Sequence, residues 1–158
     1  MKKILSLLLF TVLLSSLFGC MGATEKVFEK SGMSITLSTD FIEKDHISYT
    51  CIYDSKNIAV YTLKEEFSML NVDSEYLLDD YAELVILANQ LEDSEVMHKD
   101  NLTYFTYEKS ANGKDVSFYA FVFKGNDAFW LIQFACEQKN TDKLEQDIFK
   151  YASTVTIK

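Results

Sequence analysis

The sequence predicts an α+β fold: an antiparallel β-sheet with the element order β-β-β-α-β-β-β-α, covered by helices on both faces as an α/β/α sandwich. Three observations support this prediction. Short stretches with strand character come in two groups of three, and an amphipathic helical stretch follows each group. Two of the strand stretches are apolar at nearly every position. Such strands need cover on both sides.

The first group of strands begins with Met33–Ser38, where apolar and polar residues alternate as in a half-buried strand. Ile47–Tyr53 and Asn57–Leu63 are rich in β-branched and aromatic residues, which favour strands. The residues between them, Asp54–Asn57, have the composition of a turn. We therefore expect these two strands to form a hairpin.

A helix is predicted after the first group. It has Asp73 or Ser74 as its N-cap, and Glu75 favours its first turn. Its apolar positions recur at intervals of four and three residues, which places them on one face. These positions are Leu77, Tyr81, Leu84, Ala88 and Leu91.

The second group of strands is Val96–Glu108, Val116–Phe123 and Ala128–Glu137. Asn112-Gly113 joins the first two, and this dipeptide favours a tight hairpin because both residues tolerate positive φ. Gly125-Asn126 joins the next two by the same reasoning. The last two strands are the nearly continuous apolar ones, so we expect them at the centre of the sheet.

The final helix is predicted to begin at Thr141 or Asp142, with Asp142 and Glu145 spaced as a capping box. We expect the β-branched residues Thr154–Ile157 to leave it as an extended tail. An apolar stripe runs through Leu144, Ile148, Tyr151, Ala152 and Val155.

The N-terminus has the organisation of an export signal. Lys2 and Lys3 precede an apolar run from Ile4 to Phe18 that is too short to span a bilayer as a helix. The run ends in Leu17-Phe18-Gly19-Cys20, which resembles the lipobox of bacterial lipoproteins. In that family the thiol receives a diacylglycerol, and cleavage just before the Cys makes it the first residue. The resemblance implies a signal peptide over residues 1–19, a lipidated tether over 20–26 and one domain over 27–158.

The anchor implies a location at the cell membrane, lipid-attached through Cys20 and facing outside the cytoplasm. Two or more acyl chains hold a protein firmly on a bilayer. The six residues of the tether that follow Cys20 reach at most about 20 Å when fully extended. The domain is therefore expected to lie close to the membrane.

Composition narrows the choice of partners. The formal charge is −9, and it becomes more negative when the lysines of the leader are removed. An acidic body of this kind is repelled by phosphates, so nucleic acid is not expected as a partner. All 15 basic residues are lysines, so no Arg is available to clamp a phosphate or a carboxylate.

The element order resembles that of the PsbP-like superfamily. The opening Gly32–Phe41 and the closing Tyr151–Val155 carry the resemblance together with the order of elements. This superfamily includes the photosystem II extrinsic subunit, a Ran-binding nuclear import factor and the DcrB-type lipoproteins. The resemblance implies an antiparallel sheet between helices and an accessory or binding role. It implies no common activity, and no functional residue is carried over.

Two cysteines remain after Cys20. Cys51 and Cys136 either form a disulfide, which conditions outside the cytoplasm permit, or stay as buried thiols. The pattern of residues leaves both outcomes open.

Candidate metal or catalytic residues are few. Asp40, Glu43, Asp45 and His46 could bind a divalent cation with hard oxygen ligands and one imidazole, but a solvated acidic loop is the favoured interpretation. His98 is the only other histidine. A Cys-His nucleophile is disfavoured because both remaining cysteines lie in apolar strands.

Among the aromatic residues of the strands, Tyr119 and Trp130 are the best candidates for lining a ligand site, since their polar tips suit a half-open pocket. No catalytic motif and no cofactor-binding motif occurs. We therefore expect a membrane-tethered binding or accessory module for an envelope protein or a small molecule. The alternative is a cell-envelope hydrolase that uses a carboxylate pair such as Asp79/Glu83, or His46 and His98.

Overall fold

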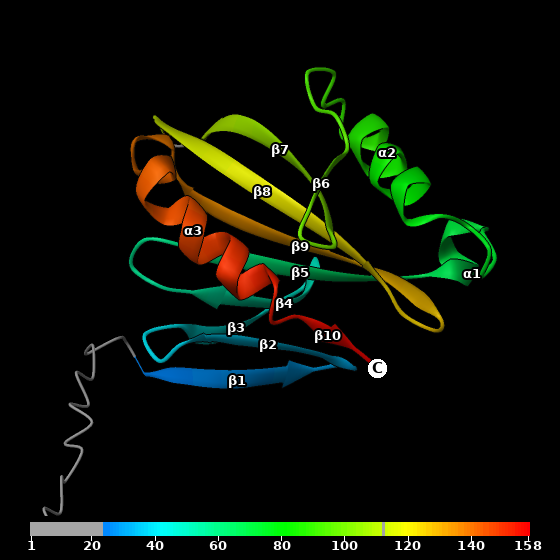
Figure 1. The fold of residues 1–158 in the computed structure, drawn as a ribbon, viewed down its shortest axis with the longest axis horizontal. Helices are drawn as coiled ribbons and strands as arrows, with labels where there is room; N and C mark the ends of the chain where they lie inside the picture. Colours follow the sequence, from blue (N-terminus) through cyan, green and yellow to red (C-terminus); the bar gives the residue numbers. More distant parts are fainter. Residues whose placement is uncertain (1–23, 112) are drawn as a thin grey trace, which may run out of the picture.

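The computed structural model describes residues 24–158 apart from residue 112, and shows two antiparallel sheets with three α-helices (Figure 1). The larger sheet has seven strands, in the spatial order β3-β4-β5-β9-β8-β7-β6. The smaller sheet has three strands, in the order β1-β2-β10. All strand pairs in both sheets are antiparallel.

The strands have the following bounds: β1 Glu25–Lys30, β2 Met33–Ser38, β3 Ile42–His46, β4 Tyr49–Asp54, β5 Ala59–Glu66, β6 Met97–Lys99, β7 Leu102–Ala111, β8 Lys114–Lys124, β9 Ala128–Glu137 and β10 Thr156–Ile157. The helices are α1 Phe67–Leu70, α2 Leu78–Ala88 and α3 Thr141–Ala152, and the 3₁₀ turn η1 Gln138–Asn140 precedes α3.

The predicted hairpins are confirmed. β4 pairs with β5, β7 with β8, and β8 with β9. Gly113 has a φ of 75°, which a residue with a side chain rarely adopts, and it turns β7 into β8. β8 and β9 lie at the centre of the large sheet with buried side chains on both faces, as their apolar sequences predicted.

Two hydrophobic cores lie on opposite faces of the large sheet. On one face, α1 and α2 pack against β7, β8 and β9, and Tyr81, Ala82 and Val85 of α2 are buried there. On the other face, α3 and the small sheet pack together, burying Ile148 of α3 beside Ile35 of β2. In Figure 1, α3 crosses the strands of the large sheet, whereas β1 and β2 lie below them.

The α+β class with antiparallel strands is confirmed, but the chain has more elements than the predicted order β-β-β-α-β-β-β-α. β1, β3 and α1 were not predicted. The single strand predicted over Val96–Glu108 is divided into β6 and β7, and the extended tail predicted over Thr154–Ile157 contains the short strand β10. Every residue of β3 is exposed, so this strand has no apolar alternation to reveal it. β6 and β10 are too short to show a period. The cover also differs from the predicted sandwich, because a three-stranded sheet shares one face with α3.

The helix boundaries were only partly predicted. α3 begins at Thr141 as expected, and residues 156–157 leave it to form β10, which pairs with β2. α2 begins at Leu78 rather than near Asp73. The Asp73 carboxylate accepts a hydrogen bond of 2.9 Å from the backbone N–H of Glu75, so it stabilises a turn ahead of the helix.

Candidate functional site

A groove of about 520 Å³ opens between α2 and the large sheet, and we call it the α2 groove. It exists because α2 presents more apolar side chains than the sheet covers: Leu84 is half-buried and Ala88 is exposed, and both line the groove. The other walls are α1 and the start of β4, while β5, β7 and β9 supply the floor. The lining residues are Ser48, Tyr49, Leu63, Glu65, Met69, Leu70, Tyr81, Leu84, Val85, Ala88, Asn89, Leu91, Phe105, Tyr107, Leu131 and Gln133.

The floor of the groove consists largely of aromatic rings, and a side-chain hydrogen bond holds one of them, Tyr107, in place. The Tyr107 hydroxyl donates a hydrogen bond to the side-chain oxygen of Gln133 on β9. The Tyr107 ring stacks on Phe118, with 4.6 Å between the centroids and 3° between the planes. Burial raises the pKa of Tyr107 above its ordinary value, so the phenol stays protonated at neutral pH. The floor therefore offers flat apolar rings and a neutral hydrogen-bonding group.

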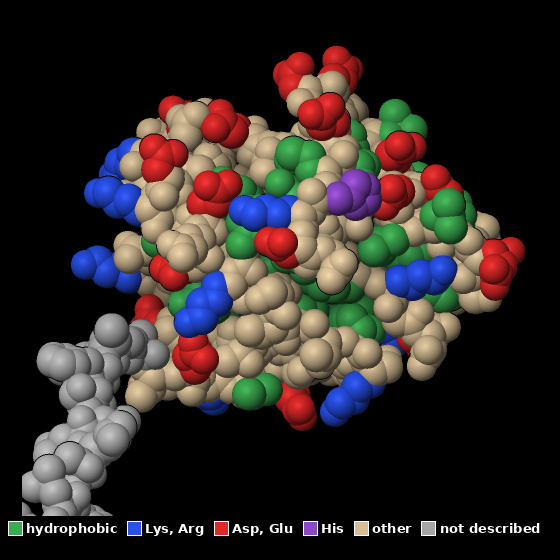
Figure 2. Space-filling view, in the orientation of Figure 1, with side chains coloured by type: hydrophobic (Ala, Val, Ile, Leu, Met, Phe, Trp, Pro, Cys, Tyr) green, Lys and Arg blue, Asp and Glu red, His purple; other side chains and the backbone are tan. Residues whose placement is uncertain are grey.

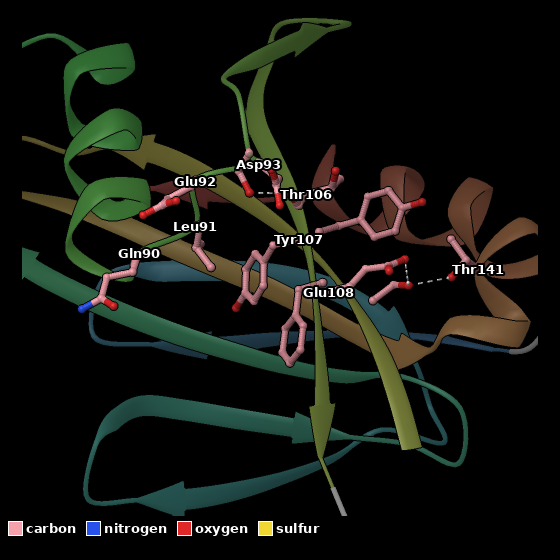
Figure 3. A pocket seen from close by; sticks show the side chains of 12 residues that line it. Gln90, Leu91, Glu92, Asp93, Thr106, Tyr107, Glu108 and Thr141 are labelled. Carbon is pink, nitrogen blue, oxygen red and sulfur yellow. Dashed lines mark hydrogen bonds between the residues drawn. The ribbon is translucent and has the colours of Figure 1, made fainter. Parts of the chain in front are cut away.

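A second hollow, of about 490 Å³, adjoins the groove through Leu91 and Tyr107, and we call it the β7 pocket (Figure 3). The loop after α2 forms one side with Gln90, Glu92 and Asp93. β7 and β8 form the other side, and Thr141 at the start of α3 closes one end.

Side-chain hydrogen bonds fix the polar wall of the β7 pocket. The Thr141 hydroxyl donates to the Ser117 hydroxyl at 3.1 Å, and Ser117 donates to a carboxylate oxygen of Glu108 at 3.4 Å. The side-chain amide of Gln138 donates to the same oxygen at 2.7 Å. Because these donors are neutral, they hold the Glu108 carboxylate in place without cancelling its charge.

The two hollows are electrostatically negative. Glu65, Glu92, Asp93 and Glu108 line them, and no lysine does. Among the ion pairs of the described residues, none involves Glu92, Asp93 or Glu108. Figure 2 shows acidic side chains gathered over the loop between α2 and β6, at the top of the view. A positively charged partner is therefore favoured at this end of the molecule.

Only one of the two aromatic candidates lines a hollow. Tyr119 is 7% exposed and lines the β7 pocket, where burial and the nearby Glu145 raise its pKa to about 12. Trp130 is 1% exposed and packs in the core beneath α3 and the small sheet. The half-open position expected for Trp130 was wrong, because Trp130 lies on the covered face of a central strand.

The four candidate metal ligands before and within β3 do not converge. Lys30 binds Glu43 at 3.0 Å and Asp45 at 3.2 Å, whereas Asp40 accepts a hydrogen bond from Ser38. The Nδ1 atom of His46 accepts a hydrogen bond of 3.1 Å from the backbone N–H of Ser48. Within residues 24–158 without 112, no group of three or more His, Cys, Asp or Glu side chains is placed to hold a metal ion.

Cys51 and Cys136 are both buried free thiols. Cys51 pairs with Thr62 on β5, Thr62 pairs with Ile132 on β9, and Cys136 lies further along β9. Two strand spacings alone separate backbones by about 10 Å, beyond the roughly 7 Å that a disulfide spans between Cα atoms. Burial raises the pKa of both thiols, so neither is an activated nucleophile.

His98 does meet a carboxylate. Its Nε2 atom lies 3.2 Å from Asp79 on α2, and its Nδ1 atom lies 3.3 Å from the Thr103 hydroxyl. The Asp79 and His98 side chains are 51% and 59% exposed, so water surrounds the pair. The other member of the predicted carboxylate pair, Glu83, also lies on an exposed part of α2.

The predicted lipidation site Cys20, the signal peptide and most of the tether lie outside the described residues. Within the part of the chain that the structure describes, no helix is long and apolar enough to cross a membrane.

The α2 groove was not predicted from the sequence, although one signal for it was visible. The stripe Leu77, Tyr81, Leu84, Ala88 and Leu91 reads as a single buried face, but Leu77 and Ala88 are exposed and only Tyr81 is fully buried. The deeper side of α2 instead includes Ala82 and Val85. An apolar surface wider than a helix can bury indicates either a groove or an interface.

The fold resembles those of several solved structures. It is similar to cyanobacterial PsbP (CyanoP) from Synechocystis sp. PCC 6803, with a TM-score of 0.52 and 15% identity over 92% of this chain and 99% of that one. It is similar to the Ran-binding protein Mog1p of Saccharomyces cerevisiae, with a TM-score of 0.55 and 10% identity over 86% of this chain and 96% of that one. A structure from Bacteroides thetaiotaomicron has a TM-score of 0.55 and 10% identity over 87% of this chain, which spans 49% of that one.

At the level of sequence, no family model matches the chain, and no curated protein is similar to it. At identities of 10% to 15%, the structural likeness concerns the fold alone. One of these structures is named a PsbP protein and another a Ran-binding protein, and they match 92% and 86% of this chain. The chain therefore has a PsbP-like fold.

Proposed function

We propose that this protein is a lipid-anchored extracytoplasmic accessory module that holds a partner protein in the α2 groove. In this proposal residues 1–19 direct export, Cys20 carries the lipid, and residues 20–26 tether the domain to the membrane. The observation that carries the binding role is the groove itself. It is an open hollow with an aromatic floor and an uncovered apolar helix face, next to carboxylates that form no ion pair within the described part of the chain.

The position of the groove suits a tethered binding module. β1 begins at Glu25, within the last residues of the predicted tether, at the lower left of Figure 1, whereas α2 lies at the upper right. A domain held at its β1 end therefore directs α2 away from the membrane. A partner approaching from the envelope would meet the groove without passing the bilayer.

Fold analogy agrees with a binding role. Mog1p is described as a Ran-binding protein, so at least one protein with this fold binds another protein. The analogy supports the class of function and gives no partner for this chain.

A hydrolase remains the second candidate because the His98 ring contacts Asp79 through Nε2 and Thr103 through Nδ1. In a hydrolase, these two contacts would let the carboxylate orient the imidazole and would let the imidazole activate the hydroxyl. Here the contact between His98 and Asp79 is open to solvent, whereas the Thr103 side chain is buried. A nucleophile needs to face the substrate, so the arrangement favours a structural contact between α2 and β6.

Photocrosslinking in the native envelope tests the binding role. A photoreactive amino acid replaces Ser48, on the wall opposite α2, in the full-length acylated protein. We expect one discrete adduct that disappears when Ala88→Trp fills the groove, and that persists in Leu87→Trp, whose side chain is exposed outside the groove. An adduct unchanged by Ala88→Trp would contradict the proposal, and so would an equal adduct from Val27 on the exposed face of β1.

A further inference from the structure

The outer edge of β7 is open along most of its length. β6 pairs with β7 only from Leu102 to Tyr104, and within the described residues no strand pairs with β7 beyond that point on this side. The backbone carbonyl of Thr106 points outward, because the Ser94 hydroxyl donates a hydrogen bond of 2.9 Å to it from the loop after α2. That contact occupies one group of an otherwise unpaired edge.

The direction of the remaining groups follows from the geometry of a strand. In an antiparallel ladder, every second residue directs its N–H and C=O toward the same neighbour. Since Thr106 faces outward, the backbone groups of Glu108 and Ser110 face outward too. This stretch of β7 is a template to which an extended chain can pair.

The β7 pocket surrounds this edge from both faces of the sheet. Leu91 and Tyr107 lie on the α2 side, and Tyr119 and Thr141 lie on the α3 side. A strand added to β7 would direct alternate side chains to these two sides. The edge supplies backbone hydrogen bonds, and the flanking hollows supply contacts for side chains.

We propose that the outer edge of β7 from Thr106 to Ser110 binds an extended segment of the partner protein by strand addition. This inference rests on the proposed binding function and specifies its geometry. The segment alternates apolar and basic residues. Its apolar side chains pack on the α2 side against Leu91 and the ring of Tyr107, and its basic side chains point to the α3 side, where they meet the Glu108 carboxylate. Glu92 and Asp93 of the loop after α2 add negative charge beside the segment.

The charge of the site argues for a basic segment. The three carboxylates have no cationic partner among the ion pairs of the described residues. The nearby Lys109 places its ammonium group 5.4 Å from the centroid of the Tyr107 ring, so this lysine contacts the ring and is not an ion partner of the three carboxylates.

The same charges argue against a second copy of this chain as the occupant. Pairing two β7 edges would bring two sets of Glu92, Asp93 and Glu108 together, and like charges in one interface are strongly unfavourable. The full chain also carries a formal charge of −9, so two copies repel each other at long range.

Binding of short peptides to the acylated full-length protein in detergent tests the proposal. The probe is a fluorescent seven-residue peptide of alternating lysine and valine, and the control replaces each lysine with glutamate. We expect the basic peptide to bind and to weaken as salt is raised, because salt screens the carboxylates. We expect the acidic peptide to bind at least about tenfold more weakly.

One change in the protein and one in the peptide separate strand addition from charge attraction, and Glu108→Gln is the control for the lost charge. Glu108→Pro removes the outward N–H of β7 without breaking the ladder with β8, since proline is tolerated at a strand edge. Glu108→Gln removes the charge and keeps the N–H. N-methylation of alternate residues blocks one backbone edge of the peptide. We expect Glu108→Pro and the methylated peptide each to weaken binding at least about tenfold relative to Glu108→Gln and the unmethylated peptide.

Hydrogen exchange gives a readout that does not depend on affinity. The amides of Glu108 and Ser110 are expected to gain protection when the basic peptide is bound. Peptide binding without that protection, or binding unchanged by Glu108→Pro, would overturn strand addition. A loss of the Ser48 adduct in Ala88→Trp would still support the proposed function in that case. A dimer that dissociates in Glu108→Pro would identify a second copy as the occupant and overturn the inference.

Discussion

The ring of Tyr81 stacks on the ring of Phe129, with 4.3 Å between their centroids and 7° between their planes. This contact joins the middle of α2 to β9, the central strand next to β5. The Tyr81 hydroxyl also donates a hydrogen bond of 2.5 Å to a carboxylate oxygen of Glu65 on β5. One side chain therefore fixes α2 over the sheet and sets the width of the α2 groove.

Replacing Tyr81 is expected to weaken the fold in two separable ways. Tyr81→Ala should lower the free energy of unfolding by about 3–5 kcal/mol, since it leaves a cavity where a buried ring stood. Tyr81→Phe keeps the stacking and loses the hydrogen bond to Glu65. This variant should therefore lower the free energy of unfolding by only about 1.5–3 kcal/mol. Urea denaturation measures both values. Equal losses for the two variants would show that the ring contact contributes little.

Leu131 and Leu84 should respond differently to truncation. Leu131 lies on β9, one of the two strands that the sequence placed at the centre of the sheet, and it is 5% exposed. Leu131→Ala should lower the free energy of unfolding by about 2–5 kcal/mol. The sequence predicted Leu84 to be buried as well, but it lines the α2 groove and is only half-buried. Leu84→Ala should therefore cost less stability than Leu131→Ala and should weaken the Ser48 crosslink. A larger stability loss for Leu84→Ala would contradict the placement of the groove.

The acid stability of the fold should depend on Glu137. Hydrogen bonds from Lys114 and Lys139 lower the pKa of this carboxylate to about 2. The ordinary value in an unfolded chain is about 4.3. A lowered pKa means that the charged form stabilises the folded state above about pH 4.3, and that this contribution disappears as the pH falls toward about 2.

We expect Glu137→Gln to lower the urea midpoint at pH 7, with the difference from the wild type shrinking between pH ~4 and pH ~2. Raised salt should reduce the difference at pH 7, because both lysines are exposed. A difference that stays constant from pH 7 to pH 2 would mean that the ion pairs do not stabilise the fold.

The two core thiols should be unreactive in the folded protein. In Cys20→Ser, a thiol reagent is expected to modify Cys51 and Cys136 slowly at neutral pH and rapidly in denaturant, because both are buried and their pKa values are raised. The mass of the unreduced protein should correspond to two free thiols. A mass lower by two hydrogens would reveal a disulfide and would contradict the strand order β4-β5-β9, which places β5 between the two thiols.

The proposed anchor predicts that Cys20 is acylated. Cys20→Ala should block incorporation of a labelled fatty acid and leave the precursor with its leader uncleaved. Cys51→Ala removes a different thiol, and it should keep the label at the level of the wild type. Equal labelling of Cys20→Ala and the wild type would remove the basis for membrane tethering.

The sequence predicted the parts of this fold whose signals are local. The alternation in Met33–Ser38 gave β2, and the dipeptide Asn112-Gly113 marked the turn between β7 and β8. Continuous apolar runs placed β8 and β9 at the centre of the sheet. Each of these features depends on residues close together in the chain, so a pattern of single residues was enough to find them.

The candidate site could not be found in the same way. The α2 groove depends on how far α2 reaches over β5, β7 and β9, and this is set by contacts such as that between Tyr81 and Phe129. Trp130 and Tyr119 both look like candidates in the sequence. The structure separates them, because one faces the covered core and the other faces a hollow beside the free edge of β7.

By itself the sequence determined the α+β class, the hairpins, the central strands and the resemblance to PsbP-like proteins, and it predicts an export signal over residues 1–19, just before Cys20. Only the tertiary structure decided that Cys51 and Cys136 are too far apart to bond and that the acidic residues near His46 do not converge on one site. Only the tertiary structure also showed that the α2 groove adjoins the β7 pocket. The physical reason is the distance along the chain between the residues that create each feature. Strand and helix periodicity is written into neighbouring residues, whereas a groove or an open strand edge arises from surfaces that meet only after distant segments have packed.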